Sequence, residues 1–296
     1  NPEMSSQDMI EGRRWAPVRL LAGTPFGVIF AAAFMAVMVF VMIFAKVLQP
    51  YAFDYINLLA RLAPPVPLSG STWAHPAGTD TLGRDLMSRL LVGTQTSMLL
   101  ALLGTCLGAV LGIALGFLAA HKGRLWDEII MGLVDFQAAM PWFIVALAVL
   151  AFLGNSMVIF VAIMALYGWE TYARITRGLV LSAREQGYAA AVRGLGARAR
   201  WVYLRHILPN IAGPLLVQLT VNFPSTILFE TSLSFLGLGI RPPMTSLGQM
   251  LGEGRDYLIN AWWLAVVPGL TIFLITLSMS ILGDWLRSKL DPSLED

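Results

Sequence analysis

Long apolar runs alternate with short polar segments along this chain of 296 residues. An apolar run of about 20 residues is the length that an α-helix needs to cross the hydrocarbon core of a bilayer. The pattern therefore predicts an all-α membrane protein with six transmembrane helices. The predicted spans are residues 26–48, 97–120, 128–153, 156–180, 208–232 and 262–285.

The first predicted span, residues 26–48, is longer than the apolar core of a signal peptide. It also lacks a small-x-small cleavage site before Gln49 and Pro50. Both properties indicate an anchor that is retained in the mature protein.

The composition supports a protein that resides in a membrane. Hydrophobic residues make up 57% of the chain and charged residues 13%, and the mean hydropathy is +0.69. One polytopic domain surrounded by membrane lipid accounts for this length. A formal net charge of +2, with no basic groove-like stripe, excludes a nucleic-acid partner. The single cysteine, Cys106, lies in an apolar run, where we interpret it as a packing residue.

The lysines and arginines are sorted between two sets of predicted loops. One set holds fourteen of these cations and the other holds six, out of 20 in the chain. The positive-inside rule then places both termini, residues 1–25 and 286–296, in the cytoplasm together with a loop at 184–206. It places residues 49–96 and 233–261 on the extracytoplasmic side.

A glycine recurs at every fourth position of the second predicted span, so that all four glycines share one face of a helix. Such a face lets another helix approach closely, which is how helices associate in lipid. The partner helix can belong to the same chain or to a second subunit, and the pattern leaves both open. The four residues are Gly104, Gly108, Gly112 and Gly116.

Four prolines, at positions 141, 214, 224 and 268, fall inside predicted spans, where each removes a backbone hydrogen bond and is expected to bend its helix. Carboxylates at membrane depth are candidates for function. For Glu170 we favour a local ion pair with Arg174, four residues later. Glu230 lies near the outer end of its span, where it can face water or a cation such as Arg241. It is our candidate for a residue that borders a solute path.

Catalytic and metal-binding signatures are absent from the sequence. There is no Walker A, Gly-x-Ser-x-Gly or His-Glu-x-x-His motif, and the three histidines lack metal-ligand spacing. The chain therefore has no recognisable ATP site, and uphill transport needs either an ion gradient or a partner ATPase. Carboxylates at the bilayer midplane and inverted repeats, which are typical of gradient-driven carriers, are not evident. This favours the partner ATPase.

A basic, small-residue segment separates the fourth and fifth predicted spans. Between Arg174 and Arg205 there are seven arginines and one acidic residue, Glu185. Its alanines favour two short helices, broken at Gly194 and Gly196, which form a compact knob. The arginines alone would also suit a loop lying on anionic lipid. The residues expected to contact a cytoplasmic partner are Arg184, Glu185, Tyr188, Ala190, Ala191, Gly194, Gly196, Arg198, Arg205 and His206.

The stretch Tyr188–Pro209 resembles the coupling-loop signature of ABC importer permeases, with Gly196 at the motif glycine and Ala190 where the general motif has glutamate. Three further motifs are similar to the C-type permease of dipeptide, oligopeptide and nickel importers. They are Gly78–Asp85 with Ser88–Leu90, Ser234–Gly239 with Pro242 and Pro243, and Gly283–Arg287 before Leu290–Pro292. The resemblance covers nearly the whole chain from about residue 20, including a permease core at 97–285.

This resemblance implies a type I ABC importer permease in the bacterial inner membrane. It implies a heterodimer with a B-type permease, two cytoplasmic ABC ATPases that hold ATP and Mg²⁺, and an extracytoplasmic solute-binding protein. This chain would have no catalytic residue, cofactor or metal of its own. The implied cargo is a peptide or peptide-like solute, with a nickel chelate or an opine as alternatives. A gradient-driven carrier is the alternative from another class. For Gly78–Asp85 we expect a capped, turn-rich entry to the second helix, with Asp80 or Asp85 as the helix cap, and we prefer this to direct binding of cargo.

Overall fold

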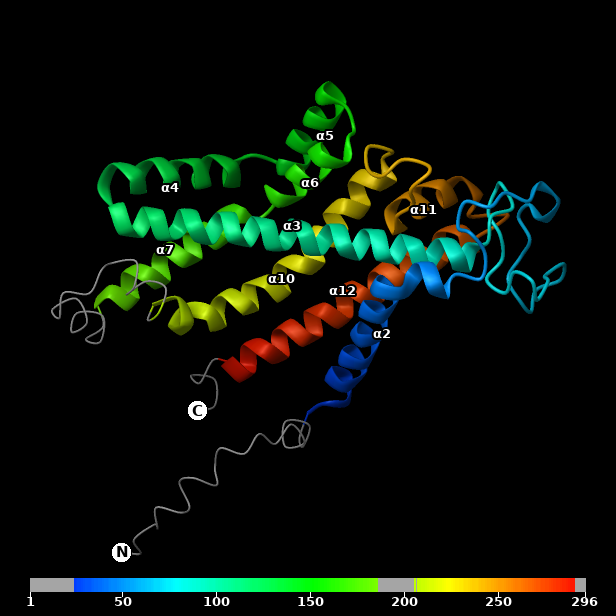
Figure 1. Cartoon of the computed structure of the whole chain (residues 1–296), viewed down its shortest axis with the longest axis horizontal. Helices are drawn as coiled ribbons and strands as arrows, with labels where there is room; N and C mark the ends of the chain where they lie inside the picture. The colour runs from blue at the N-terminus through cyan, green and yellow to red at the C-terminus, as the bar shows by residue number, and fades with distance from the viewer. Residues whose placement is uncertain (1–23, 186–204, 206, 291–296) are drawn as a thin grey trace, which may run out of the picture.

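The computed structural model describes residues 24–185, 205 and 207–290, and these residues form helices without any β-strand. Figure 1 shows the helices in chain order. They are α2 (Phe26–Leu48), the 3₁₀-helix η1 (Leu58–Ala60), α3 (Leu86–Lys122), α4 (Arg124–Ala139), α5 (Trp142–Leu153), α6 (Met157–Ala165), α7 (Trp169–Glu185), α10 (Leu208–Phe235), α11 (Leu247–Gly254), the 3₁₀-helix η3 (Arg255–Tyr257) and α12 (Trp263–Leu290).

Five stretches of the described residues are long and apolar enough to cross a membrane as helices, and a bent helix pair supplies a sixth candidate. The five are α2, α3, α6 with α7, α10 and α12. The bounds of α2 coincide with the first predicted span, because the whole run from Phe26 to Leu48 is apolar apart from Lys46. The all-α class and the five to six spans agree with the expectation from hydropathy.

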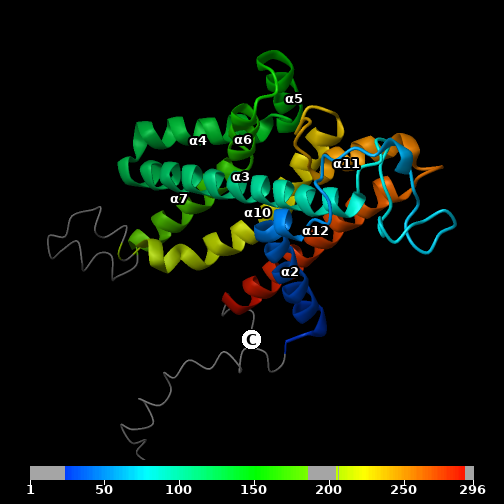
Figure 2. The ribbon, with the colours of Figure 1, turned by 45° about the vertical axis from the view of Figure 1, so that its right-hand side comes forward.

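The sixth candidate span is broken in the middle. Helices α4 and α5 are bent by 89° relative to each other. The break falls at Met140 and Pro141, where the proline cannot continue the hydrogen bonding of α4. A single straight span over residues 128–153 is therefore not what the chain forms. In Figures 1 and 2, α4 lies beside α3, whereas α5 projects away from the bundle.

The other prolines do not break their helices. Pro214 and Pro224 lie inside α10, and Pro268 lies inside α12, and both helices continue past them. The fourth predicted span does contain a break, between α6 and α7, where Gly168 adopts a positive φ of 83°. An added Cβ at Gly168 would also collide with the side chain of Asn222. This site thus needs glycine for two separate reasons.

The longest helix, α3, links the two ends of the bundle. Its 37 residues span about 55 Å, which exceeds the roughly 30 Å of a hydrocarbon core. It begins at Leu86, earlier than the predicted residue 97, because Asp85 caps its first turn. In Figure 1 the first turn of α3 lies beside residues 49–85 and α11. We call this end of the bundle, formed by residues 49–85 and α11, the loop end. The last turn of α3 lies at the opposite end, where α7 stops and α10 starts.

Two large clusters of buried apolar side chains hold the spans together. One joins α3 to α5, α6 and α10, and the other joins α2, α3, α10, α11 and α12. Figure 2 shows α2 and α12 side by side on the face of the bundle away from α4. The core thus surrounds α3 and α10, and α2 lies at its edge.

Candidate functional site

A buried ionic network lies at the loop end of the bundle, centred on Arg89 of α3. Arg89 is 2% exposed, and its Nη1 donates to Asp80 Oδ2 at 2.6 Å and to Glu253 Oε2 at 2.9 Å. Its Nη2 lies 3.4 Å from Thr245 Oγ1. Arg84 reaches the same two carboxylates, at 2.6 Å to Asp80 and 3.4 Å to Glu253. Two arginines and two carboxylates therefore neutralise one another, which is the condition for burying such charges.

The neighbouring Asp85 organises the start of α3. Its Oδ2 accepts from the backbone N–H of Ser88 at 2.8 Å and from the Ser88 hydroxyl at 2.7 Å. Its Oδ1 lies 2.9 Å from Nδ1 of His75. Asp85 is thus the N-cap of α3, as its place before an apolar helix predicts. Asp80, by contrast, is no helix cap, because it accepts backbone N–H groups inside its own turn and binds the two arginines.

These contacts fasten residues 49–85 to the bundle. The turn of the Gly78–Asp85 motif needs glycine at Gly83, which has a positive φ and packs against the backbone of Asn57. Trp263, at the start of α12, donates from Nε1 to the carbonyl of Thr79 at 3.2 Å. The motif is therefore joined to α3, α11 and α12. Sequence reasoning found the motif but missed Glu253, which lies 164 positions from Arg89.

Glu230 of α10 is completely buried in this chain, so the expectation that it faces water or Arg241 is wrong here. Its Oε2 accepts from Ser97 of α3 at 3.0 Å, and its Oε1 accepts from Ser234 at 2.7 Å. Ser97 Oγ in turn accepts from the backbone N–H of Leu247 at 3.1 Å. The hydroxyls satisfy the carboxyl without a cation, and they connect α3, α10 and α11 at one point.

The glycine face of α3 packs against α6 and α7 of the same chain. At Gly112 an added Cβ would collide with the carbonyl oxygen of Trp169 and would lie 2.7 Å from Cβ of Tyr172. At the other three positions the nearest atom would lie 2.6 to 2.8 Å away. A contact this close requires the absence of side chains. Of the two open alternatives, the structure uses packing within one chain for Gly104, Gly108, Gly112 and Gly116.

Two ion pairs connect α4 to α7. Arg177 binds Asp127 through both Nε and Nη2, and the Nη2 contact measures 2.6 Å. Arg174 Nη2 donates to Asp135 Oδ1 at 2.9 Å. The side chains of Arg174 and Asp135 are each more than half exposed. The first pair is bidentate and partly buried, so it contributes more to the contact between the helices.

The expected local pair between Glu170 and Arg174 is wrong, because Arg174 turns to Asp135 on α4 instead. Glu170 Oε2 accepts from Gln137 Nε2 at 3.0 Å. Gln137 Oε1 also accepts from Trp169 Nε1 at 2.6 Å. Glu170 and Trp169 of α7 therefore both bind Gln137 of α4.

Most of the predicted coupling segment lies outside the described residues. Arg184 and Glu185 form the last turn of α7, and Arg205 is exposed just before α10. The remaining candidates, which stay predictions, are Tyr188, Ala190, Ala191, Gly194, Gly196, Arg198 and His206.

The two helices that flank this segment are packed on each other and on the last turns of α3. Their contact is an apolar cluster of six buried side chains, which forms the core of the opposite end of the bundle. The cluster therefore joins α3, α7 and α10 at this end of the bundle. The cluster consists of Ala120, Val180, Ala183, Ile207, Ile211 and Leu215.

Among the described residues, no group of three or more histidines, cysteines, aspartates or glutamates is arranged to hold a metal ion. Cys106 is exposed on α3, which differs from the packing role expected for it. Because Cys106 lies within a membrane span, its exposed side chain faces lipid or another protein.

Comparison with known proteins decides the family. Residues 112–295 match the family described as the binding-protein-dependent transport system inner membrane component. The chain belongs to this family. It is therefore a permease subunit of an ABC importer, a non-catalytic, multi-pass component of the bacterial inner membrane.

Two relatives illustrate the similarity of this permease to characterised systems. It is 40% identical over 235 residues to the di/tripeptide transport system permease protein DppC of Pseudomonas aeruginosa, covering 79% of this chain and 78% of the relative. It is 36% identical over 255 residues to the glutathione transport system permease protein GsiD of Pectobacterium atrosepticum, covering 85% and 82%.

The fold is also similar to a solved transporter. A chain of the MetNI methionine ABC transporter, in an inward-facing conformation, matches the permease with a TM-score of 0.54 at 19% identity. The match covers 70% of this chain and 98% of the other. At this level of identity the similarity establishes the permease fold alone, consistent with the predicted all-α importer class.

Proposed function

We propose that this permease forms, together with a second related permease subunit, the membrane pathway of an ATP-driven importer of short peptides or peptide-like solutes. The observation that carries the cargo class is the pair of relatives at 36–40% identity, one named for di- and tripeptides and the other for glutathione, itself a modified tripeptide. Both relatives are covered over about four fifths of their length.

The proposed complex contains a B-type permease, two cytoplasmic ATPases and an extracytoplasmic solute-binding protein. ATP and Mg²⁺ bind the ATPases, and this chain contributes no cofactor. The family supports the requirement for such partners in general terms. The proposed orientation places residues 184–206 in the cytoplasm, where their arginines suit an acidic or polar cleft on an ATPase.

The packing of the bundle supports a route from this segment to the far side of the membrane. Helix α7 leads into the segment and α10 leads out of it, and both contact α3. The close glycine contact makes α3 and α7 move as one body, and α3 reaches the ionic network at the loop end. Closure of the ATPases would thus shift both ends of the pathway together, as a rigid-body transition between two states.

Transport by the reconstituted complex tests the proposal. The permease is purified with its co-expressed partner subunits and placed in liposomes that enclose ATP and Mg²⁺. We expect uptake of a labelled dipeptide, tripeptide or glutathione when the solute-binding protein is supplied outside. Liposomes that enclose a non-hydrolysable ATP analogue form the control.

Two results would contradict the proposal. Uptake that follows a proton or sodium gradient without ATP would assign the chain to a gradient-driven carrier. ATP-dependent uptake of a nickel chelate or an opine, with no uptake of any peptide, would keep the importer and reject the cargo.

A further inference from the structure

An apolar cavity of about 290 Å³ lies between α2, α3 and α12, beside the core cluster that joins these helices. Its walls include Phe34, Met38 and Val41 of α2, and Val267, Leu270 and Leu274 of α12. It is open on one side. We propose that this cavity binds one acyl chain of a phospholipid from the leaflet at the loop end.

The depth of the cavity matches one leaflet of a bilayer. Trp262 lines the end of the cavity nearest the start of α12, immediately before that helix begins. Tryptophans are enriched at the membrane–water interface. At about 1.5 Å per residue, Leu274 lies about 18 Å further along α12. Half of a hydrocarbon core of roughly 30 Å is about 15 Å. The cavity therefore extends from the interface to the middle of the membrane.

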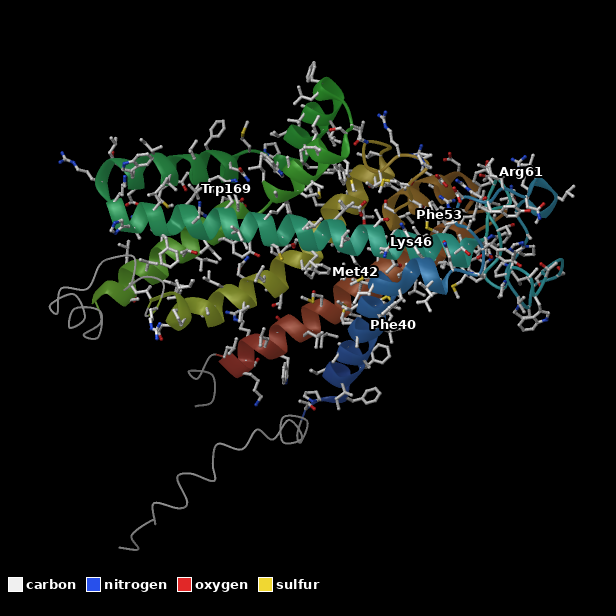
Figure 3. The ribbon with its side chains drawn as sticks, viewed as in Figure 1. Phe40, Met42, Lys46, Phe53, Arg61 and Trp169 are labelled. Atoms are coloured by element: carbon white, nitrogen blue, oxygen red, sulfur yellow. The ribbon has the colours of Figure 1, made fainter. Side chains whose placement is uncertain are left out.

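The wall formed by α2 has a similar depth, because its lining residue Phe34 lies twelve residues, or about 18 Å, before Lys46. Helix α2 runs toward the loop end, as Phe40, Met42 and Lys46 show in Figure 3, with Phe53 and Arg61 beyond it. Lys46 lies in the last turn of α2 and marks the polar boundary.

The chemistry of the walls excludes water as a stable occupant. Ten of the twelve lining residues are apolar, and the other two are Thr94 and Thr271. The hydroxyl of Thr271 already donates to the carbonyl of Val267 at 2.9 Å. A water molecule needs two to four polar partners, and an empty cavity forfeits contacts on its whole lining. A hydrocarbon chain is the occupant that restores those contacts.

The size and surroundings favour an acyl chain over a protein segment. A water molecule takes about 30 Å³ in the liquid, and a methylene, which also has one heavy atom, takes a similar volume. The cavity therefore accommodates about ten methylenes. A helix, about 10 Å across, cannot enter it. The surface around the cavity is lipid-like, since Val37 is 54% and Phe273 55% exposed. Lipid that covers these residues thus has direct access to the opening.

Photo-labelling of the reconstituted complex tests this site. The liposomes contain phosphatidylethanolamine and phosphatidylglycerol with a trace of phosphatidylcholine that carries a diazirine midway along one acyl chain. After illumination, mass spectrometry locates the labelled residues. We expect Val41 and Leu274, which line the cavity, to be labelled more strongly than Val37 and Phe273, which face outward near them. This comparison needs no substitution.

A pair of variants on α2 sharpens the test. Val41→Trp places a large side chain in the cavity and narrows it, and Val37→Trp adds the same side chain at an exposed position four residues away. Loss of contact for about two methylenes corresponds to about a tenfold loss of occupancy. We therefore expect about tenfold less cavity labelling in V41W and unchanged labelling in V37W, with both proteins verified as intact complexes by size-exclusion chromatography.

Three results would overturn the proposal. One is equal labelling of cavity-lining and outward-facing residues in the unsubstituted protein. Another is labelling in V41W as strong as in V37W. The third is a cross-link from a photoreactive residue at Met38 to a second protein subunit without lipid labelling, which would assign the cavity to a protein contact.

Discussion

Gly112 makes the closest contact of the glycine face, where α3 approaches α7. An added Cβ would meet the carbonyl oxygen of Trp169, Cβ of Tyr172 and the backbone nitrogen of Ala173, none of which can rotate away. We predict that Gly112→Ala destabilises the permease by about 1–3 kcal/mol, the usual cost of overpacking. Thermal unfolding of the purified protein measures the effect. Gly178→Ala on α7 is the matched control, since nothing lies within 4 Å of its added Cβ. Equal midpoints for the two variants would contradict the role of the glycine face.

Arg89 is the residue on which the ionic network depends. Its removal leaves Glu253 with only a long contact of 3.4 Å to a cation, Arg84, and deprives buried Asp80 of one of its two arginine partners. We predict that Arg89→Gln costs about 3–5 kcal/mol, as for other broken buried ion pairs. Residues 49–85 should then become accessible to protease at a lower temperature. Arg255→Gln removes an arginine whose only described ion pair is the exposed one with Asp256, and should change stability by less than about 1 kcal/mol. Unchanged protection in R89Q would refute the prediction.

The contact between α4 and α7 rests on two ion pairs of unequal strength. Arg177 holds Asp127 bidentately in a partly buried position, whereas Arg174 and Asp135 are mostly exposed. We predict that Arg177→Gln weakens the contact by about 1.5–3 kcal/mol and Arg174→Gln by less than about 1 kcal/mol. Hydrogen exchange of residues 124–139 should rise in the first variant and stay nearly constant in the second. The reverse order would show that the exposed pair dominates.

The complete permease is expected to relay ATPase motion through residues 184–206. We predict that Gly196→Asp uncouples the complex, so that ATP hydrolysis continues while uptake falls strongly, because a charged side chain would enter a contact that uses glycine. Gly196→Ala should have a smaller effect, since it adds neither charge nor length. Uptake and hydrolysis are measured on the same liposomes, with membrane insertion verified for each variant. Normal uptake by G196D would remove this segment from the mechanism.

Features that depend on neighbouring residues were predictable. The apolar run 26–48 became α2 with the same bounds, and Asp85 caps α3 as its position before an apolar helix indicates. The glycine spacing in the second span predicted a close helix contact, because residues four apart share a helix face. Pro141 predicted a disturbance of its span, and the chain breaks there by 89°.

The primary structure therefore determined the membrane class, the approximate positions of the apolar spans and the motifs that resemble the family, because each of these depends on local periodicity and composition. Only the tertiary structure decided which distant groups meet. Arg89 pairs with Glu253 across 164 positions, and Glu230 meets Ser97 across 133. The groups that a buried carboxyl contacts depend on how the helices around it cross. Periodicity places Glu230 on a helix, and its place beside a solute path stays a prediction. The packing of α3 and α11 around Glu230 buries its carboxyl at a junction of three helices.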